Sequence, residues 1–133
     1  MPKPETTKRR RALLRAAQRY AKEHLGEFDL TVGEVAQAVG TSPRQLQRVF
    51  REEAGEDFRT YLLRVRMTRG RRLLTREPNP LPIHRTAPRV GYRQHSGFRQ
   101  AFMRYYGYNP SEVQAPPPSY DAEWRERERR THA

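Results

Sequence analysis

Four side chains that can read base pairs lie close together between positions 44 and 48. Arginine can form a forked pair of hydrogen bonds with guanine, and Arg44 and Arg48 supply two such side chains. Glutamine can form two hydrogen bonds with adenine, and Gln45 and Gln47 supply two of these. Arg51 comes one turn later and is better placed for a phosphate. These residue types predict a surface that reads double-stranded DNA, but the solvated polar face of an ordinary helical hairpin has the same composition.

The residues around this cluster predict the helix that would position it. Gly40 can end a preceding helix in a left-handed conformation, Ser42 can cap the next helix, and Pro43 suits its first position. Apolar residues with helical spacing complete both helices: Val32, Val35, Ala36 and Val39 before the turn, and Leu46, Val49 and Phe50 after it. Residues 31–50 therefore have the pattern of a helix-turn-helix.

A second stretch, residues 83–110, repeats this pattern. Gly91 corresponds to Gly40 at an offset of 51 residues, and Phe102 corresponds to Phe50 at an offset of 52. At the same two offsets, Ala36, Val39, Leu46 and Gly55 correspond to Ala87, Val90, Phe98 and Gly107. A duplicated helix-turn-helix arises by chance far less often than a single one, so the repeat favours the DNA-binding interpretation.

The charge balance points to a polyanionic partner. Lys and Arg number 27 against 15 Asp and Glu, which gives a net charge of +12 and a pI of about 11.0. Charge alone does not separate nucleic acid from an anionic membrane surface or the ribosome. No apolar run approaches the roughly 18 residues of a membrane span, and no signal-peptide core follows the basic start. We therefore expect a protein of the cytoplasm or nucleoid.

The sequence offers little for metal or covalent chemistry. The absence of cysteine excludes disulfides, thiolate zinc sites and cysteine nucleophiles. No nucleophile and base stand out together, so we predict no enzyme and no cofactor. The four histidines lack metal-binding spacing: His24, His84, His95 and His132. Five aromatic residues could stack single-stranded bases, but their helical spacing favours a core: Phe50, Phe98, Phe102, Tyr105 and Tyr106.

The remaining segments predict elements that support the two modules. We expect a disordered basic arm at residues 1–9, a first helix-turn-helix subdomain at 10–56, and a linker helix at 57–76 capped by Asp57. A second subdomain at 77–114 and a Pro-rich spacer with a charged tail at 115–133 follow. The basic run could reach a phosphate backbone or form a solvated helix start: Lys8, Arg9, Arg10 and Arg11.

With both modules in view, the chain resembles the AraC/XylS family of bacterial transcription regulators over about residues 12–114. The second module carries the more specific signature, and the first module and the linker agree in order and spacing. The matching residues are Val35-Ala36, Val39-Gly40, Ser42, Leu46, Val49-Phe50, Gly55, Tyr61-Leu62, Arg66, Leu73-Leu74, Ile83, Ala87, Val90-Gly91-Tyr92, Ser96, Phe98, Phe102, Tyr106-Gly107 and Asn109-Pro110-Ser111-Glu112.

The resemblance implies an all-α fold of about seven helices, with two helix-turn-helix subdomains joined by a long linker helix. The second helix of each module would enter a major groove, with the two grooves about 34 Å apart on one face of the duplex. A monomer would then read a long asymmetric site and could bend the DNA. In the second module, the implied outward residues are His95, Ser96, Arg99 and Gln100.

The second module departs from the family pattern in its supporting helix. Pro88 lies inside that helix, where it removes a hydrogen bond and crowds the carbonyl of His84. Thr86 stands where an aliphatic residue is usual, and Arg93 replaces the usual cap. The second module is therefore the weaker candidate for reading bases, and Ser96 has an alternative structural role within the turn.

The sequence thus predicts a small, stand-alone, sequence-specific DNA-binding regulator that acts as a monomer. Family members usually activate transcription by contacting RNA polymerase, so the resemblance implies an activator with RNA polymerase as a second partner. Two alternatives stay open. One is an architectural or recombination accessory protein that bends DNA, and the other is an RNA polymerase-binding factor whose basic face is incidental.

Overall fold

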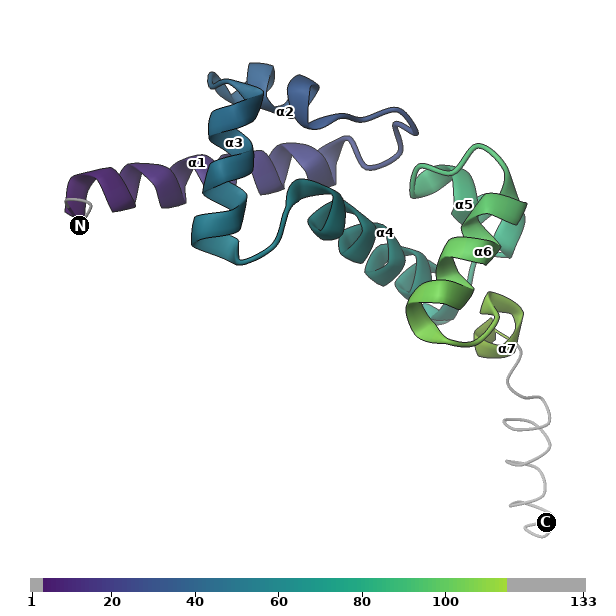
Figure 1. Ribbon diagram of the computed structural model, residues 1–133. Helices are drawn as coiled ribbons and strands as arrows, with labels where there is room; N and C mark the ends of the chain where they lie inside the picture. Colours follow the sequence, from purple (N-terminus) through teal and green to yellow (C-terminus); the bar gives the residue numbers. More distant parts are fainter. Residues whose placement is uncertain (1–3, 115–133) are drawn as a thin grey trace, which may run out of the picture. The chain divides into compact units, whose positions relative to one another are not determined.

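The structure is a computed structural model that describes residues 4–114. Seven α-helices follow in order (Figure 1): α1 (Pro4–Glu23), α2 (Val32–Val39), α3 (Pro43–Val49), α4 (Phe58–Thr75), α5 (Ile83–Arg89), α6 (His95–Tyr106) and α7 (Pro110–Gln114). A π-helical turn, Phe50–Ala54, continues α3. Residues 4–114 contain no strand, which confirms the predicted all-α fold. The expected spacer and tail at 115–133 lie outside the described residues.

The chain divides into two compact units, Met1–Arg66 and Met67–Ala133, and the boundary between them falls inside α4. A helix close to the expected linker at 57–76 is present, but each half of it belongs to the core of one unit. Tyr61 and Val65 are buried in the first unit, and Met67 and Leu74 are buried in the second. Residues of α4 therefore contribute to the core of each unit.

The start of α1 differs from the expected disordered arm. Residues 4–9 are helical, because Pro4 suits the first turn of a helix and Glu5 complements its positive end. The basic run from Lys8 to Arg11 therefore lies within α1.

The start of α4 is fixed by Asp57, as the sequence predicted. Asp57 Oδ1 accepts a hydrogen bond from the backbone N–H of Thr60 at 2.9 Å. This bond holds the pKa of the Asp57 carboxyl below its usual value. Just before it, Gly55 ends the π-helical turn with a φ of 73°, the conformation expected of a helix-ending glycine. The turn that joins the first module to α4 is thus fixed by interactions between neighbouring residues.

Small residues allow α1 to lie close to α2 and α3 in the first unit. Ala17 and Ala21 are fully buried on the side of α1 that contacts these helices. Phe50 closes the core, with its ring centroid 5.6 Å from that of Phe58 and 5.5 Å from that of Tyr61. The buried side of α3 is therefore anchored both to α1 and to the start of α4.

Aromatic side chains dominate the core of the second unit. Phe98 and Phe102 are fully buried, with ring centroids 5.6 Å apart, and the Tyr106 ring lies 4.6 Å from that of Phe102. The Tyr106 hydroxyl donates a hydrogen bond to the backbone oxygen of Met67 at 3.3 Å. The prediction that these aromatics form a core is confirmed for the two phenylalanines. It is wrong for Tyr105, which is 40% exposed.

Gly70 lets α6 approach α4 closely within the second unit. A Cβ atom at this position would lie 2.8 Å from Cε1 and 3.0 Å from Cζ of Phe98. Real Cβ atoms essentially never come that close to another heavy atom, and the Phe98 ring is fully buried and cannot easily move away. Gly70 is therefore required for the observed packing of Phe98, and through it for the position of α6.

We expect Gly70→Ala to destabilise the protein by up to about 2 kcal/mol. The gain in helix propensity, about 1 kcal/mol, is outweighed by overpacking against a buried ring, which costs about 1–3 kcal/mol. Urea denaturation followed by circular dichroism measures the difference. Gly97→Ala is the matched control, since a Cβ there meets Tyr92 at an ordinary 3.7 Å and should leave stability equal or higher. Equal stabilisation by both substitutions would show that the Phe98 contact does not constrain α4.

Candidate nucleic-acid interface

The turn between α2 and α3 fixes the start of the first candidate recognition helix. Gly40 adopts a φ of 80°, and its backbone N–H donates to the last carbonyls of α2. The Ser42 hydroxyl accepts a hydrogen bond from the backbone N–H of Gln45 at 3.1 Å, and Pro43 is the first residue of α3. All three roles agree with the sequence prediction. They fix where α2 ends and where α3 begins.

The structure places the predicted reading residues of α3 on the side opposite its buried residues. Leu46 and Val49 are fully buried, and Arg44 and Arg48, one turn apart, are exposed. Gln47 lies on the same outward side and is partly exposed, while Gln45 lies at its edge. Within residues 4–114, neither arginine side chain has an ion pair or hydrogen bond. Both guanidinium groups are therefore free to form forked contacts.

Arg51 lies beyond the regular part of α3, inside the π-helical turn. Its side chain is exposed, but its positive charge is close enough to Asp57 to help lower the pKa of that carboxyl. Because a π-helical turn is wider than an α-helical one, Arg51 does not continue the face of Arg44 and Arg48 in strict register. This position suits the phosphate contact predicted for Arg51 better than a base contact.

In the second module, α6 presents the four predicted residues to solvent. His95, Ser96, Arg99 and Gln100 are all exposed, and none forms a hydrogen bond or ion pair with the described part of the chain. The Ser96 hydroxyl therefore does not have the alternative structural role considered for it. Met103, 40% exposed, lies one turn after Arg99 and Gln100 on the same side of α6. Its helical spacing from Arg99 was the signal that could have identified it.

The cap of α6 differs from the prediction. The residue at the cap position is Gln94, not Arg93, and its side chain makes no capping hydrogen bond. The helix starts one residue later than the sequence pattern indicated because the turn after Gly91 is longer than the corresponding turn after Gly40. The second module therefore lacks the side-chain cap that fixes α3.

Pro88 and Thr86 are accommodated within α5. Pro88 is the residue before the last of α5, and the carbonyl it leaves without a helical partner belongs to His84, which is exposed to solvent. The fully buried Thr86 hydroxyl donates a hydrogen bond to the backbone oxygen of Pro82 at 3.0 Å. The two departures from the family pattern thus leave α5 as a short helix that still contacts α6.

The basic run at the start of α1 is partly engaged inside the first unit. Arg10 forms ion pairs with Glu52 and Glu53, and its side chain is only 16% exposed. Arg11 Nε lies 3.4 Å from a carboxylate oxygen of Glu53. Arg10 is therefore not available to reach a phosphate backbone, whereas Arg9 is exposed and has no ion pair within residues 4–114.

Within residues 4–114, no group of three or more His, Cys, Asp or Glu side chains is arranged to hold a metal ion. None of the helices in that range is both long enough and apolar enough to cross a membrane.

A family model described as a helix-turn-helix domain matches residues 35–115, which is more than half of the chain. The regulatory protein HrpB of Ralstonia nicotianae is 34% identical over 103 residues, which cover 77% of this chain and 22% of HrpB. The arabinose operon regulatory protein of Escherichia coli is 28% identical over 102 residues, which cover 77% of this chain and 34% of that protein. The chain thus spans about a third or less of the length of these relatives.

Solved structures show the same fold. The C-terminal domain of AraT, a response regulator from Geobacillus stearothermophilus, has a TM-score of 0.71 and 34% identity, covering 77% of this chain and 83% of that one. The DNA-binding domain of AdpA, solved in complex with a target DNA, has a TM-score of 0.69 and 29% identity, covering 83% of this chain and 94% of that one.

The fold and the two modules define an all-α protein built on a duplicated helix-turn-helix. The chain belongs to the AraC/XylS family of helix-turn-helix proteins. Its relatives are transcriptional regulators with DNA-binding domains of this type and not enzymes, in agreement with the expectation from the sequence.

We expect Arg10→Ala to lower the free energy of unfolding by about 1–3 kcal/mol, because it removes the cation that pairs with Glu52 and one of the two cations that pair with the largely buried Glu53 carboxylate. Its effect on DNA affinity at a temperature where the variant is folded should be small. Thermal and urea denaturation measure the first quantity, and fluorescence anisotropy with a labelled duplex measures the second. Arg9→Ala removes a neighbouring exposed charge and should change stability by less than about 0.5 kcal/mol. If Arg10→Ala weakened DNA binding at unchanged stability, the ion-pair role would be wrong.

Proposed function

We propose that the protein is a sequence-specific regulator of transcription that inserts α3 and α6 into major grooves of double-stranded DNA. The observation that carries the proposal is the free pair Arg44 and Arg48, one helical turn apart on a capped helix whose other side is buried. A rigid helix with two unpaired guanidinium groups matches the pattern of hydrogen-bond acceptors at guanine edges in a major groove.

The second module supports the same function from a different surface. Arg99 and Gln100 provide groups for guanine and adenine, and Met103 adds an apolar side chain that could meet a thymine methyl group. The α6 helix has twelve residues and is anchored by fully buried Phe98 and Phe102. We propose that both helices read bases, α3 through two arginines and α6 through a mixed polar and apolar face.

Two reading helices on one chain allow a monomer to recognise a long asymmetric site. We propose that α3 and α6 engage successive major grooves, about 34 Å apart along one face of the duplex. DNA that does not present both grooves in register would have to bend, which adds a dependence on the deformability of the central steps. The complex of the similar AdpA domain with a target DNA supports duplex DNA as the partner.

Activation of transcription and contact with RNA polymerase are further parts of this proposal. The support is the family, which includes the arabinose operon regulatory protein named above. A protein with this function would act at the nucleoid. Sites beside promoters would support regulation, whereas sites at recombination junctions would support the architectural alternative.

Binding selection from a random duplex pool tests the proposal directly. We expect an asymmetric motif with two conserved blocks about 10 base pairs apart, one for each module. A single short block would mean that α6 does not read bases. Failure to enrich any motif, with binding equally strong to all duplexes, would contradict sequence-specific recognition by either helix.

We expect Arg48→Ala to weaken binding to the selected site by about 1–3 kcal/mol, a rise in Kd of about 5- to 150-fold, and to relax base preference at one position. The reason is the loss of one forked contact in the groove. Anisotropy titrations against the selected duplex and its single-base variants measure both effects. Arg59→Ala removes an exposed arginine of α4 and is the control for lost charge. Unchanged base preference in Arg48→Ala would remove Arg48 from the reading face.

A further inference from the structure

A row of basic side chains follows one side of α1 and is not part of the two modules. Lys8, Arg15, Arg19 and Lys22 are all exposed and recur at intervals of seven, four and three residues, which places them on one side of a helix. We call these four residues the α1 basic stripe. It spans 15 residues, or about 21 Å of helix from the first Cα to the last.

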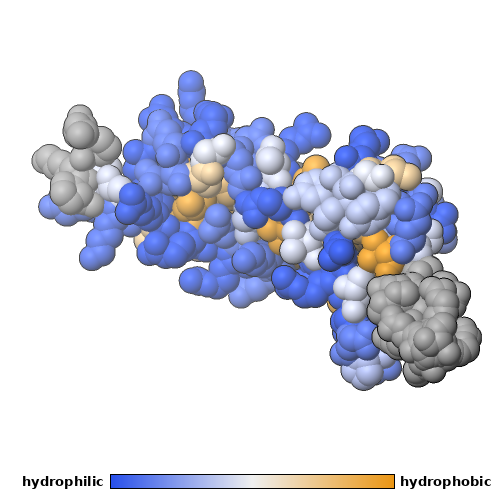
Figure 2. All heavy atoms as spheres, turned by 90° about the horizontal axis from the view of Figure 1, so that it is seen from below, coloured by the Kyte–Doolittle hydropathy of each residue, from blue (hydrophilic) through white to orange (hydrophobic). Residues whose placement is uncertain are grey.

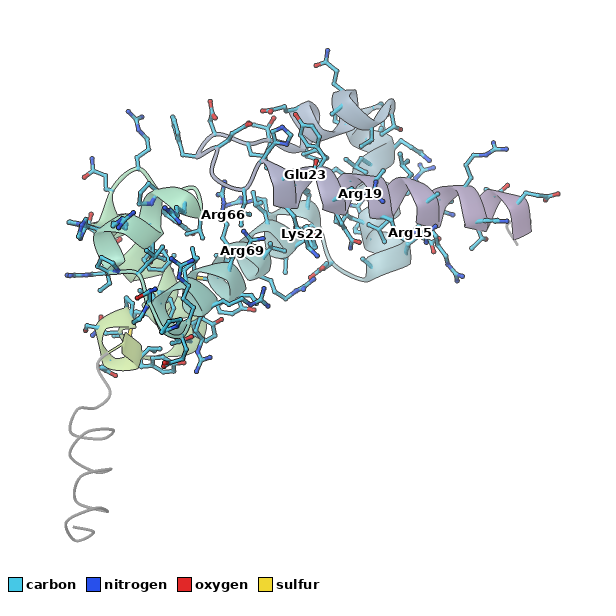
Figure 3. The ribbon with its side chains drawn as sticks, turned by 180° about the vertical axis from the view of Figure 1, so that it is seen from behind. Arg15, Arg19, Lys22, Glu23, Arg66 and Arg69 are labelled. Carbon is cyan, nitrogen blue, oxygen red and sulfur yellow. The ribbon has the colours of Figure 1, made fainter. Side chains whose placement is uncertain are left out.

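The stripe lies on the outer side of α1, away from the core of the first unit. The opposite side of the helix carries the buried residues Leu14, Ala17 and Ala21, which contact α2 and α3. In Figure 1, α3 crosses α1 on the side nearer the viewer, and Figure 3, seen from behind, labels Arg15, Arg19 and Lys22 along α1. The stripe and the reading face of α3 are thus on opposite sides of one compact unit.

A single straight duplex cannot reach both faces. Packed helices lie about 8–10 Å apart, and each helix with its side chains is about 10–12 Å across. The tips of Arg44 and Arg48 are therefore about 20 Å from the stripe, with the protein core between them. DNA held in its groove by α3 leaves the α1 basic stripe uncovered.

The charge of the stripe is not neutralised by the protein. Arg11 lies in the same row but pairs with Glu53, whereas the four stripe residues have no ion pair within residues 4–114. Glu5 precedes Lys8 by three residues and Glu23 follows Arg19 by four, so one carboxylate lies beside each end of the row, but neither forms an ion pair with it in the described part of the chain (Figure 3). A run of four unpaired cations facing solvent is a strong attraction for a polyanion.

The surroundings of the stripe favour a phosphate backbone over a protein surface. Protein interfaces centre on buried aromatic or apolar anchors, and the large exposed hydrophobic residues of the described chain are Phe28, Leu63, Met103 and Tyr105, none of them on α1. Figure 2 shows a different face, seen from below the view of Figure 1, which is mostly hydrophilic with a few apolar patches. One strand of B-DNA carries a phosphate every 3.4 Å along its axis, so the stripe can lie along roughly six of them.

We propose that the α1 basic stripe holds a second segment of double-stranded DNA while α3 and α6 occupy the first. This inference rests on the proposed function for the first segment only. The stripe contacts phosphates and reads no bases, so the second segment can have any sequence. The protein thereby links two duplexes, or two distant parts of one DNA molecule, without needing a second copy of the chain.

Capture of two duplexes tests the proposal. The protein is loaded on a bead-bound duplex that carries the selected site, the beads are washed, and a labelled duplex of random sequence is added. We expect the loaded beads to retain the labelled duplex. The triple variant Arg15→Ala, Arg19→Ala, Lys22→Ala should retain at least about tenfold less, with a salt slope lower by about 2.7, or 0.9 for each lost phosphate contact. Its binding to the first duplex should be unchanged.

A matched control removes the same charge elsewhere. Arg9, Arg59 and Arg72 are exposed and lie outside both the stripe and the reading faces, so Arg9→Ala, Arg59→Ala, Arg72→Ala should capture like the unmodified protein. All six positions are exposed helix sites where alanine is well tolerated, and circular dichroism verifies the fold. If both triple variants captured equally less of the labelled duplex, the effect would come from net charge and not from the stripe, and the proposal would be overturned.

Other outcomes also decide the matter. If the triple variant still captures the labelled duplex, the second duplex is held by self-association of the protein or by a different face. If the unmodified protein captures no labelled duplex, an acidic protein surface is left as the partner of the stripe. Either result overturns the proposal. The amount of protein that stays on the bead-bound duplex is measured separately. If the protein does not stay bound to that duplex, the result contradicts the proposed function and not the role of the stripe. The stripe is then tested with protein held on beads through a C-terminal tag, where the same two triple variants should differ in capture of the labelled duplex.

Discussion

Burial of one side of α3 is the constraint on which the first module depends. The helix has only seven residues, too few to be stable in isolation, so its existence requires the packing of Leu46 and Val49. Because both side chains are fully buried, α3 cannot rotate about its axis without exposing them. Arg44 and Arg48 are held outward as a consequence. The cap at Ser42 sets where the helix begins, but the direction of its reading face comes from the core.

The second module reaches the same arrangement by a different balance of interactions. The α6 helix has no side-chain cap, but it has twelve residues and an aromatic row in which Phe98, Phe102 and Tyr106 follow each other at helical spacing. Gly70 brings the backbone of α4 against the first of these rings. The position of α6 thus depends on the packing of its aromatic side chains and not on a side-chain cap. This explains why unusual residues in the supporting helix, Pro88 and Thr86, are tolerated: both are accommodated inside α5, and the outward residues of α6 stay exposed.

Features set by neighbouring residues could be predicted from the sequence, and features set by distant ones could not. The roles of Gly40, Ser42 and Asp57 each depend on three or four adjacent residues, and all three predictions are confirmed. Arg10 looked like a free cation because its partners, Glu52 and Glu53, are more than forty residues away in the chain. The helical start at Pro4 was missed for another reason: a polar composition was taken as disorder although proline and glutamate suit a first turn. Met103 was not singled out, because helical spacing alone does not show whether an apolar residue beside the polar face is exposed.

The division of arginines between internal and external roles, more than the net charge, determines what this protein can bind. Arg10, Arg64 and Arg71 direct their guanidinium groups to Glu52, Glu56 and Tyr108 within their own units. Such groups stabilise the fold and cannot release counterions from a phosphate backbone. The arginines that can do so are those without internal partners, such as Arg44 and Arg48 on α3 and Arg15 and Arg19 on α1. Because the internally paired arginines do not contribute, the salt dependence of binding to one duplex will be smaller than a net charge of +12 suggests.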